Sequence, residues 1–198
     1  SLGEKAKIKK ISFIGEKIFK DKKLKGVILS EEYKPWKFLS GKKYLNESII
    51  RYDEKLLKNF YLNKGYYNVV INSSFAKMTD EESFELVFNI DAKSKLFFGT
   101  LKINLPSDFS KTNYEKVEKF FKKLESEPYS INRIEDIVEK IEMITINEQY
   151  ESIKANISEN IVADKINIDF KIEETEKFFV ERINVLGNNV TLESVIRN

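Results

Sequence analysis

The order of predicted strands and helices repeats along this chain, and the repeat limits its possible folds more than any other feature. Each copy contains a strand, two helices and two further strands. The first copy has alternating or β-branched stretches at residues 6–14, 68–75 and 83–90, and the second at 96–105, 151–158 and 165–173. A third begins with a strand at 178–186 and a turn at 187–189. The interval of about 80 to 90 residues suits a small α+β module.

The clearest helix lies in residues 46–64 and ends at a glycine. Its apolar residues recur at helical spacing and predict one buried stripe: Ile49, Leu56, Leu57, Phe60 and Tyr61. Charged residues occupy the other side: Arg51, Glu54, Lys55 and Lys58. Gly65 can take the left-handed conformation that closes a helix, so Tyr66 should start a new direction and lead into a strand.

The remaining helices have weaker signals. In the second copy, Thr112 and Glu115 have the spacing of a capping box, and Pro128 separates the two helices. In the first copy, Pro35 and Trp36 begin an aromatic link between the helices. We expect this link to pack its aromatic rings under the loop, and a ligand pocket is the alternative.

Composition excludes several classes of function. The chain has no cysteine and no histidine, so disulfides, thiolate chemistry and the usual zinc and serine-histidine sites cannot be built. We therefore expect no catalytic residue, no metal and no cofactor. The 34 basic and 32 acidic residues nearly cancel, which disfavours a nucleic-acid partner. No apolar run is long enough for a membrane helix, and no charged-then-apolar stretch has the pattern of a signal peptide, so the leader of an exported protein would lie outside this stretch.

Several short motifs occur in a characteristic order: residues 11–15 (ISFIG), 35–36 (PW), 41–44 (GKKY), 61–66 (YLNKGY) and 179–183 (FVERI) before Gly187. With the repeat, they resemble the POTRA domain over essentially the whole chain. The resemblance implies an α+β fold of tandem POTRA domains, each a three-stranded mixed sheet in the order 1-3-2 covered by two helices. The boundaries would be 5–93, 95–176 and 177–198, similar to the third, fourth and start of the fifth domain of a series. The chain departs from the family pattern at Glu16, Pro106 and Gln149.

In the order 1-3-2 the second strand of each copy lies on an edge, and an edge strand can accept another extended segment. The candidate protein-binding residues on these two edges are Asn68, Val69, Val70, Ile71, Asn72, Ser73, Ser74, Phe75, Ser152, Ile153, Lys154, Ala155, Asn156 and Ile157. A bulge is expected at residues 72–74, where the apolar alternation breaks. The residues expected to shape the turns are Gly15, Gly65, Tyr66 and Gly187.

The resemblance implies a non-enzymatic scaffold of outer-membrane protein assembly at the periplasmic face of the bacterial outer membrane. Its partners would be unfolded outer-membrane β-barrel proteins, accessory assembly lipoproteins and periplasmic chaperones, with no nucleic acid. Membrane contact would come only through a C-terminal barrel outside this stretch. The alternatives are the POTRA region of a two-partner secretion or division protein and, from another class, an RNA-binding α+β module.

Overall fold

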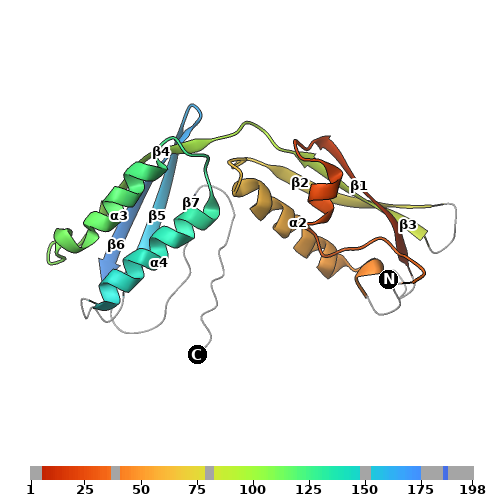
Figure 1. The fold of residues 1–198 in the computed structure, drawn as a ribbon, viewed down its shortest axis with the longest axis horizontal. Helices are drawn as coiled ribbons and strands as arrows, with labels where there is room; N and C mark the ends of the chain where they lie inside the picture. Colours follow the sequence, from red (N-terminus) through yellow and green to blue (C-terminus); the bar gives the residue numbers. More distant parts are fainter. Residues whose placement is uncertain (1–5, 37–40, 79–82, 148–152, 175–184, 187–198) are drawn as a thin grey trace. The chain divides into compact units, whose positions relative to one another are not determined.

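The computed structural model describes residues 6–36, 41–78, 83–147, 153–174 and 185–186, and Figure 1 draws these residues in colour. The chain divides into two compact units, residues 1–95 and 96–198. No helix in the described residues is both long and apolar enough to cross a membrane.

The first unit is a three-stranded mixed sheet with its helices on one face (Figure 1). Its elements are β1 (Lys7–Glu16), α1 (Asp21–Lys25), a 3-10 turn (Gly41–Lys43), α2 (Glu47–Leu62), β2 (Val70–Lys77) and β3 (Ser83–Asp91). The strand order is β1-β3-β2, with β1 parallel and β2 antiparallel to β3. The POTRA-like fold expected from the sequence is therefore confirmed in this unit.

The core of the first unit forms between α2 and the helix-facing side of β1 and β3. Phe13 and Phe88 stack with ring centroids 5.5 Å apart, and Leu57 is fully buried. Tyr61 is also fully buried, and its hydroxyl donates to the carbonyl of Lys17. Because burial disfavours the charged phenolate, it raises the pKa of Tyr61 to about 12.

The buried stripe of α2 differs from the predicted stripe. The residues that α2 buries are Ile50, Asp53, Leu57, Tyr61 and Leu62. Ile49 and Leu56 are half-buried. The stripe is shifted because the Asp53 carboxylate faces inward and accepts from the backbone N–H groups of Leu29 (2.6 Å) and Ser30 (3.1 Å).

Asn46 begins α2, and its side chain accepts from the N–H groups of Ser48 and Ile49. At the other end Gly65 has a φ of +93°, and the N–H of Tyr66 returns to the carbonyl of Tyr61 at 3.0 Å. This six-to-one bond is the usual closure of a helix by a left-handed glycine.

The second unit repeats this order and adds one strand. Its elements are β4 (Phe97–Asn104), α3 (Lys111–Leu124), α4 (Ile131–Asn147), β5 (Ile153–Val162), β6 (Lys165–Glu174) and β7 (Val185–Leu186). The sheet order is β4-β6-β5-β7, so the three strands of the copy keep the order 1-3-2 and β7 lies outside β5. Of the predicted third domain only β7 is described, and Gly187 lies outside the described residues.

The predicted capping box at α3 is wrong. The helix begins after Ser110, which is its N-cap residue, and no side chain caps it. Thr112 lies inside the helix instead of preceding it, so its side chain and that of Glu115 do not occupy the positions that a capping box requires.

Candidate strand-binding edges

The edge strand of the first unit is β2, and it starts later than predicted. Asn68 lies in a turn and Val69 is buried before the strand, which begins at Val70 and continues to Lys77. The predicted bulge at residues 72–74 is wrong, because β2 pairs with β3 without a register shift from Val70 to Lys77. A continuous strand therefore presents one regular edge.

The register of β2 fixes which backbone groups face away from the sheet. Met78 donates its N–H to the carbonyl of Ser83 at 2.8 Å, so Met78 faces β3. In an antiparallel pair, residues that bond to the neighbour alternate with residues whose N–H and C=O point to the other side. The outward-facing residues of β2 are Ile71, Ser73, Phe75 and Lys77.

One of these outward N–H groups already has an acceptor. The N–H of Ser73 donates to Oε1 of Glu54 at 2.7 Å, so a carboxylate from α2 covers the middle of the edge. The N–H groups of Ile71, Phe75 and Lys77 have no acceptor among the described residues. The sequence analysis placed Glu54 on the solvent side of its helix. Helical spacing could not predict its contact with Ser73, because the spacing carries no information about which strand lies beside the helix.

The opposite edge, on β1, is covered by the segment that links the helices. Ile8 accepts from the N–H of Tyr33 at 2.6 Å, and Ala6 accepts from the N–H of Leu45 at 2.8 Å. The ring of Tyr44 lies 6.5 Å from that of Tyr33, but Trp36 is 72% exposed, so the expectation that the link buries its aromatic rings fails at Trp36.

A second glutamate closes the middle of β1. The N–H of Ile11 donates to Oε1 of Glu32 at 3.0 Å, and Lys25 pairs with the same carboxylate at 2.5 Å. Burial opposes ionisation of Glu32, but the hydrogen bonds from Lys25 and Ile11 outweigh it and hold the pKa of Glu32 below its usual value. Of the two edges of this sheet, β2 is the less covered by described residues.

In the second unit both edges have neighbours. Next to β4, Phe98 donates its N–H to the carbonyl of Glu127 at 2.8 Å and accepts from the N–H of Ser126 at 2.9 Å. On the other side β7 pairs in parallel with β5 at Ile157 and Ser158. The prediction that this strand forms the outer edge is therefore wrong at Ile157, because a later segment of the chain pairs there.

Of the other predicted residues of this second edge, one is not described by the structure and four are. Ser152 is outside the described residues. Ile153, Lys154, Ala155 and Asn156 form the first part of β5 and pair with β6. On their outer side no strand pairs with them within the described ranges.

Comparison with known proteins relates the first unit to a family. A family model named POTRA, described as a surface antigen variable number repeat, matches residues 6–93. The chain is 25% identical to the outer membrane protein assembly factor BamA of Buchnera aphidicola over 98% of this chain and 32% of that protein. It is 24% identical to BamA of Neisseria meningitidis over 98% of this chain and 25% of that protein. The chain thus spans about a third or less of these relatives.

Solved structures with the same fold contain tandem domains. The crystal structure of POTRA domains 3–5 of Haemophilus influenzae BamA has a TM-score of 0.56 at 15% identity, covering 85% of this chain and 61% of that one. POTRA domains 1–2 of Omp85 from Anabaena have a TM-score of 0.54 at 8% identity, covering 86% of this chain and 96% of that one. These likenesses show the fold.

Proposed function

We propose that the chain is a non-catalytic periplasmic module of an outer-membrane protein assembly factor, because the POTRA family model matches residues 6–93. The similarity to BamA over 98% of the chain supports this proposal. The proposed domains are residues 5–93, 95–176 and the start of a further domain at 177–198.

The first unit binds extended segments of unfolded outer-membrane proteins along the outer side of β2. The observation that carries this proposal is the row of outward N–H groups at Ile71, Phe75 and Lys77, which no described residue covers. An incoming strand gains main-chain hydrogen bonds there without requiring a particular sequence, which suits many different clients. On β2 itself, the side chains of Val70 and Phe75 are 46% and 44% exposed and lie on opposite faces of the sheet. An incoming strand can therefore contact side chains on both faces of the sheet.

The expected affinity is low. A net contribution of roughly 1 kcal/mol for each of about four backbone hydrogen bonds corresponds to a dissociation constant on the order of 1 mM. Glu54 lowers the affinity further, because a client must displace this carboxylate to reach the N–H of Ser73. Weak binding allows a client to be passed on.

The partners of the whole assembly follow from the POTRA resemblance. They are unfolded outer-membrane β-barrel proteins, accessory assembly lipoproteins and periplasmic chaperones, and the module acts at the periplasmic face of the outer membrane. The pairing edge is the part of this function that can be tested on the chain alone.

A peptide titration followed by amide chemical shifts tests strand addition. The probe is a short peptide of alternating valine and threonine, and a matched peptide carries N-methyl groups on every amide so that neither of its edges can donate hydrogen bonds to β2. We expect shifts at Ile71, Phe75 and Lys77 with the first peptide and not with the second. Shifts confined to α1 and α2, or equal shifts with both peptides, would overturn the proposal.

A further inference from the structure

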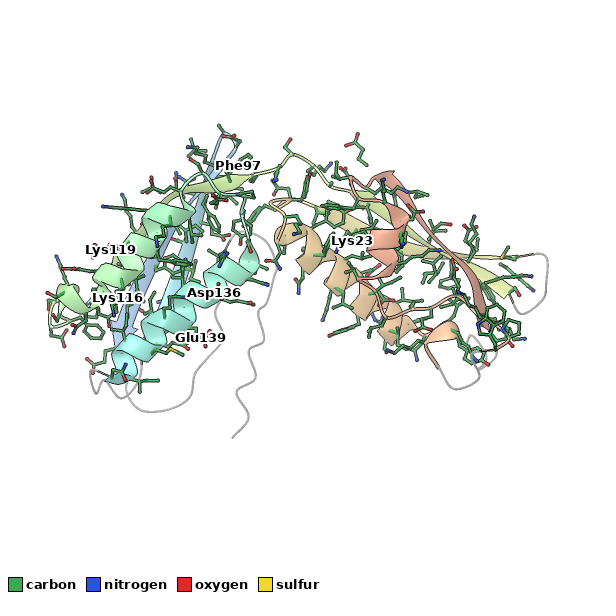
Figure 2. All side chains as sticks on the ribbon, in the orientation of Figure 1. Lys23, Phe97, Lys116, Lys119, Asp136 and Glu139 are labelled. Atoms are coloured by element: carbon green, nitrogen blue, oxygen red, sulfur yellow. The ribbon has the colours of Figure 1, made fainter. Side chains whose placement is uncertain are left out.

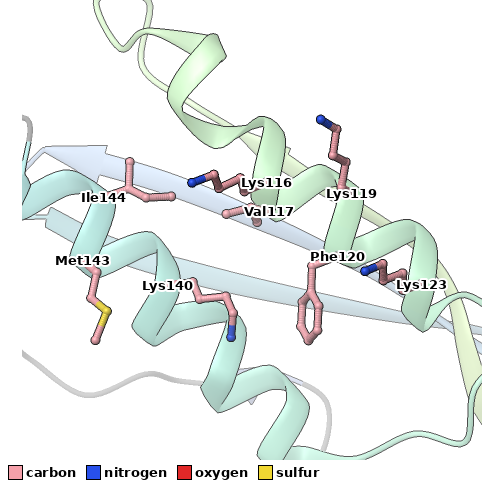
Figure 3. A pocket seen from close by; sticks show the side chains of 8 residues that line it. All are labelled: Lys116, Val117, Lys119, Phe120, Lys123, Lys140, Met143 and Ile144. Carbon is pink, nitrogen blue, oxygen red and sulfur yellow. The ribbon is translucent and has the colours of Figure 1, made fainter.

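A groove with a volume of about 490 Å³ lies between α3 and α4 of the second unit. Its apolar lining consists of Val117 and Phe120 from α3 and Met143 and Ile144 from α4. Figure 3 shows Phe120 extending from α3 toward α4, with Lys140 beside it. The Lys140 ammonium lies 4.8 Å from the centre of the Phe120 ring. Met143 is 55% exposed, so a large apolar side chain faces water in a hollow, as in many interaction sites.

The border of this groove is basic. Lys116, Lys119 and Lys123 recur on α3 at spacings of three and four residues and line the groove with Lys140. None of the three α3 lysines pairs with a carboxylate in the part of the chain that the structure describes. Glu115 and Glu118 are adjacent in sequence to Lys116 and Lys119; Glu115 lines the adjoining hollow, and Glu118 lines neither hollow.

The acidic residues of α4 do not neutralise this border. Figure 2 shows Lys116 and Lys119 on α3 and Asp136 and Glu139 on α4. None of the four acidic residues of α4 is among the lining residues of the groove: Glu135, Asp136, Glu139 and Glu142. Asp136 pairs with Arg133 at 3.3 Å on its own helix. The groove therefore combines an apolar floor with an excess of positive charge along its sides.

We propose that this groove binds an amphipathic helix of a partner protein, with the apolar face of the helix on the floor and acidic side chains along the lysines. Lys116 and Lys123 are seven residues apart, which corresponds to about 10.5 Å along α3 at about 1.5 Å per residue. Two turns of a helix fit this length, with apolar anchors at positions i, i+3, i+4 and i+7. Carboxylates beside these anchors meet the lysines, so charge complementarity sets the orientation and the rate of association.

The shape of the site favours a helix over a single acyl chain or a membrane surface. The groove is open to solvent and does not enclose its contents, so an acyl chain lying in it would leave one side in water. A helix covers the floor with one face and presents its polar face to solvent. A flat bilayer surface cannot fill a hollow between two helices. This site belongs to the second unit, and its proposal does not depend on strand addition at β2.

The test measures binding of a designed helical peptide to the 198-residue chain by fluorescence anisotropy. The peptide carries leucine at i, i+3, i+4 and i+7 and glutamate on both sides of this stripe. We expect saturable binding that weakens with salt and that weakens about tenfold in a Lys116→Glu, Lys123→Glu variant, as two reversed charge pairs predict. Lys122→Glu is the matched control, because Lys122 is exposed on the same helix but does not line the groove, and it should change affinity less than about twofold.

Two further measurements keep the proposal falsifiable. A peptide with lysine in place of glutamate should bind the doubly reversed variant better than the original chain. Met143→Asp should weaken binding about tenfold, whereas Ile146→Asp, at a 71% exposed position outside the lining, should not. Equal losses in Lys122→Glu and the double variant would overturn the proposal. Binding to anionic phosphatidylglycerol vesicles without binding to the peptide would overturn it in favour of a lipid site.

Discussion

Gly15 lies inside β1 with a backbone conformation that other residues rarely adopt. Its φ is +85°, and a Cβ atom at this position would lie 2.4 Å from the carbonyl oxygen of Ile90. The sequence placed the end of the strand here, but β1 continues to Glu16, which pairs with Asp91. The glycine is needed because the parallel neighbour approaches closely.

We therefore expect Gly15→Ala to destabilise the first unit by about 2 to 3 kcal/mol, from the left-handed backbone and the displacement of β3. Denaturant unfolding followed by circular dichroism measures the change. Gly26→Ala is the control, because Gly26 has a right-handed φ of −77° and its nearest neighbouring atom would be 3.3 Å away. A similar loss in both variants would contradict the role assigned to Gly15.

Tyr61 makes the stability of the first unit depend on alkaline pH. Its pKa is about 12 in the folded chain, above the value of about 10 for an unfolded tyrosine. A raised pKa means that the folded state favours the neutral phenol, so the contribution to stability is complete below about pH 10 and is lost as the pH rises through about 12.

A titration of tyrosinate absorbance tests this dependence. We expect Tyr61→Phe to remove the last step of the titration, whereas Tyr52→Phe, at a 50% exposed position on the same helix, should leave that step in place. If the latest ionisation persists in Tyr61→Phe, another tyrosine is responsible and the assignment is wrong.

At the scale of elements, the two edges of the first sheet differ in how they are covered. Each edge has an outward N–H that donates to a glutamate: Ser73 on β2 to Glu54, and Ile11 on β1 to Glu32. Among the described residues, only β1 also bonds to the backbone of the segment between the two helices, where Tyr33 donates its N–H to the carbonyl of Ile8. Covering an edge in this way prevents unwanted pairing with other chains.

We expect Glu54→Ala to make the Ser73 amide exchange with solvent about tenfold faster, since loss of its acceptor removes roughly 1.4 kcal/mol of protection. The alternating peptide should also bind more tightly, because no carboxylate has to be displaced. Amide exchange and the peptide titration measure the two effects. Glu32→Ala, the matched change on β1, should leave peptide affinity unchanged, and equal gains in both variants would contradict the assignment of β2 as the open edge.

The hairpin between β5 and β6 contains a strained residue. Val162 pairs with Lys165 across a two-residue turn, and Ala163 in this turn has a φ of +57°. A left-handed conformation costs roughly 1 to 2 kcal/mol for a residue with a Cβ atom. We expect Ala163→Gly to stabilise the second unit by about 1 kcal/mol in thermal unfolding, and Ala155→Gly, within β5, to destabilise it by about 0.5 to 1 kcal/mol. Changes of the same sign at both sites would contradict this explanation.

Periodicity predicted the elements well where the local sequence decides them. The alternation around Phe88 and the glycine after α2 are examples, because strand period and helix closure depend on neighbours along the chain. The inward-facing Asp53 and the edge contact of Glu54 could not be predicted in this way. Both carboxylates bind backbone N–H groups of distant segments, so their positions depend on tertiary structure.

At the scale of the whole molecule, the resemblance to POTRA domains predicted the strand order of both copies but not the coverage of their edges. The first strand is covered in each copy by the segment that joins the two helices: Tyr33 donates to Ile8 in one, and Phe98 donates to Glu127 in the other. The second strands differ. The described residues place a later strand beside β5 and none beside β2. The two copies should therefore differ in their ability to accept a client.

This difference leads to a prediction for a chain that ends at Glu174 and so lacks β7. A tethered strand acts at an effective concentration in the millimolar range, similar to the dissociation constant of about 1 mM expected for a client, so β7 competes well for β5. Without it, we expect the amides of β5 around Ile157 to exchange faster and the alternating peptide to shift them.

Two comparisons make this test specific. Val185→Pro in the full chain should have a similar effect on β5, because proline cannot donate a backbone hydrogen bond, while the amides of β2 should be unaffected in both variants. Unchanged exchange around Ile157 would show that β7 does not protect this edge. Client binding would then be expected equally on β2 and β5, and the number of clients held by such a chain would increase with the number of its copies.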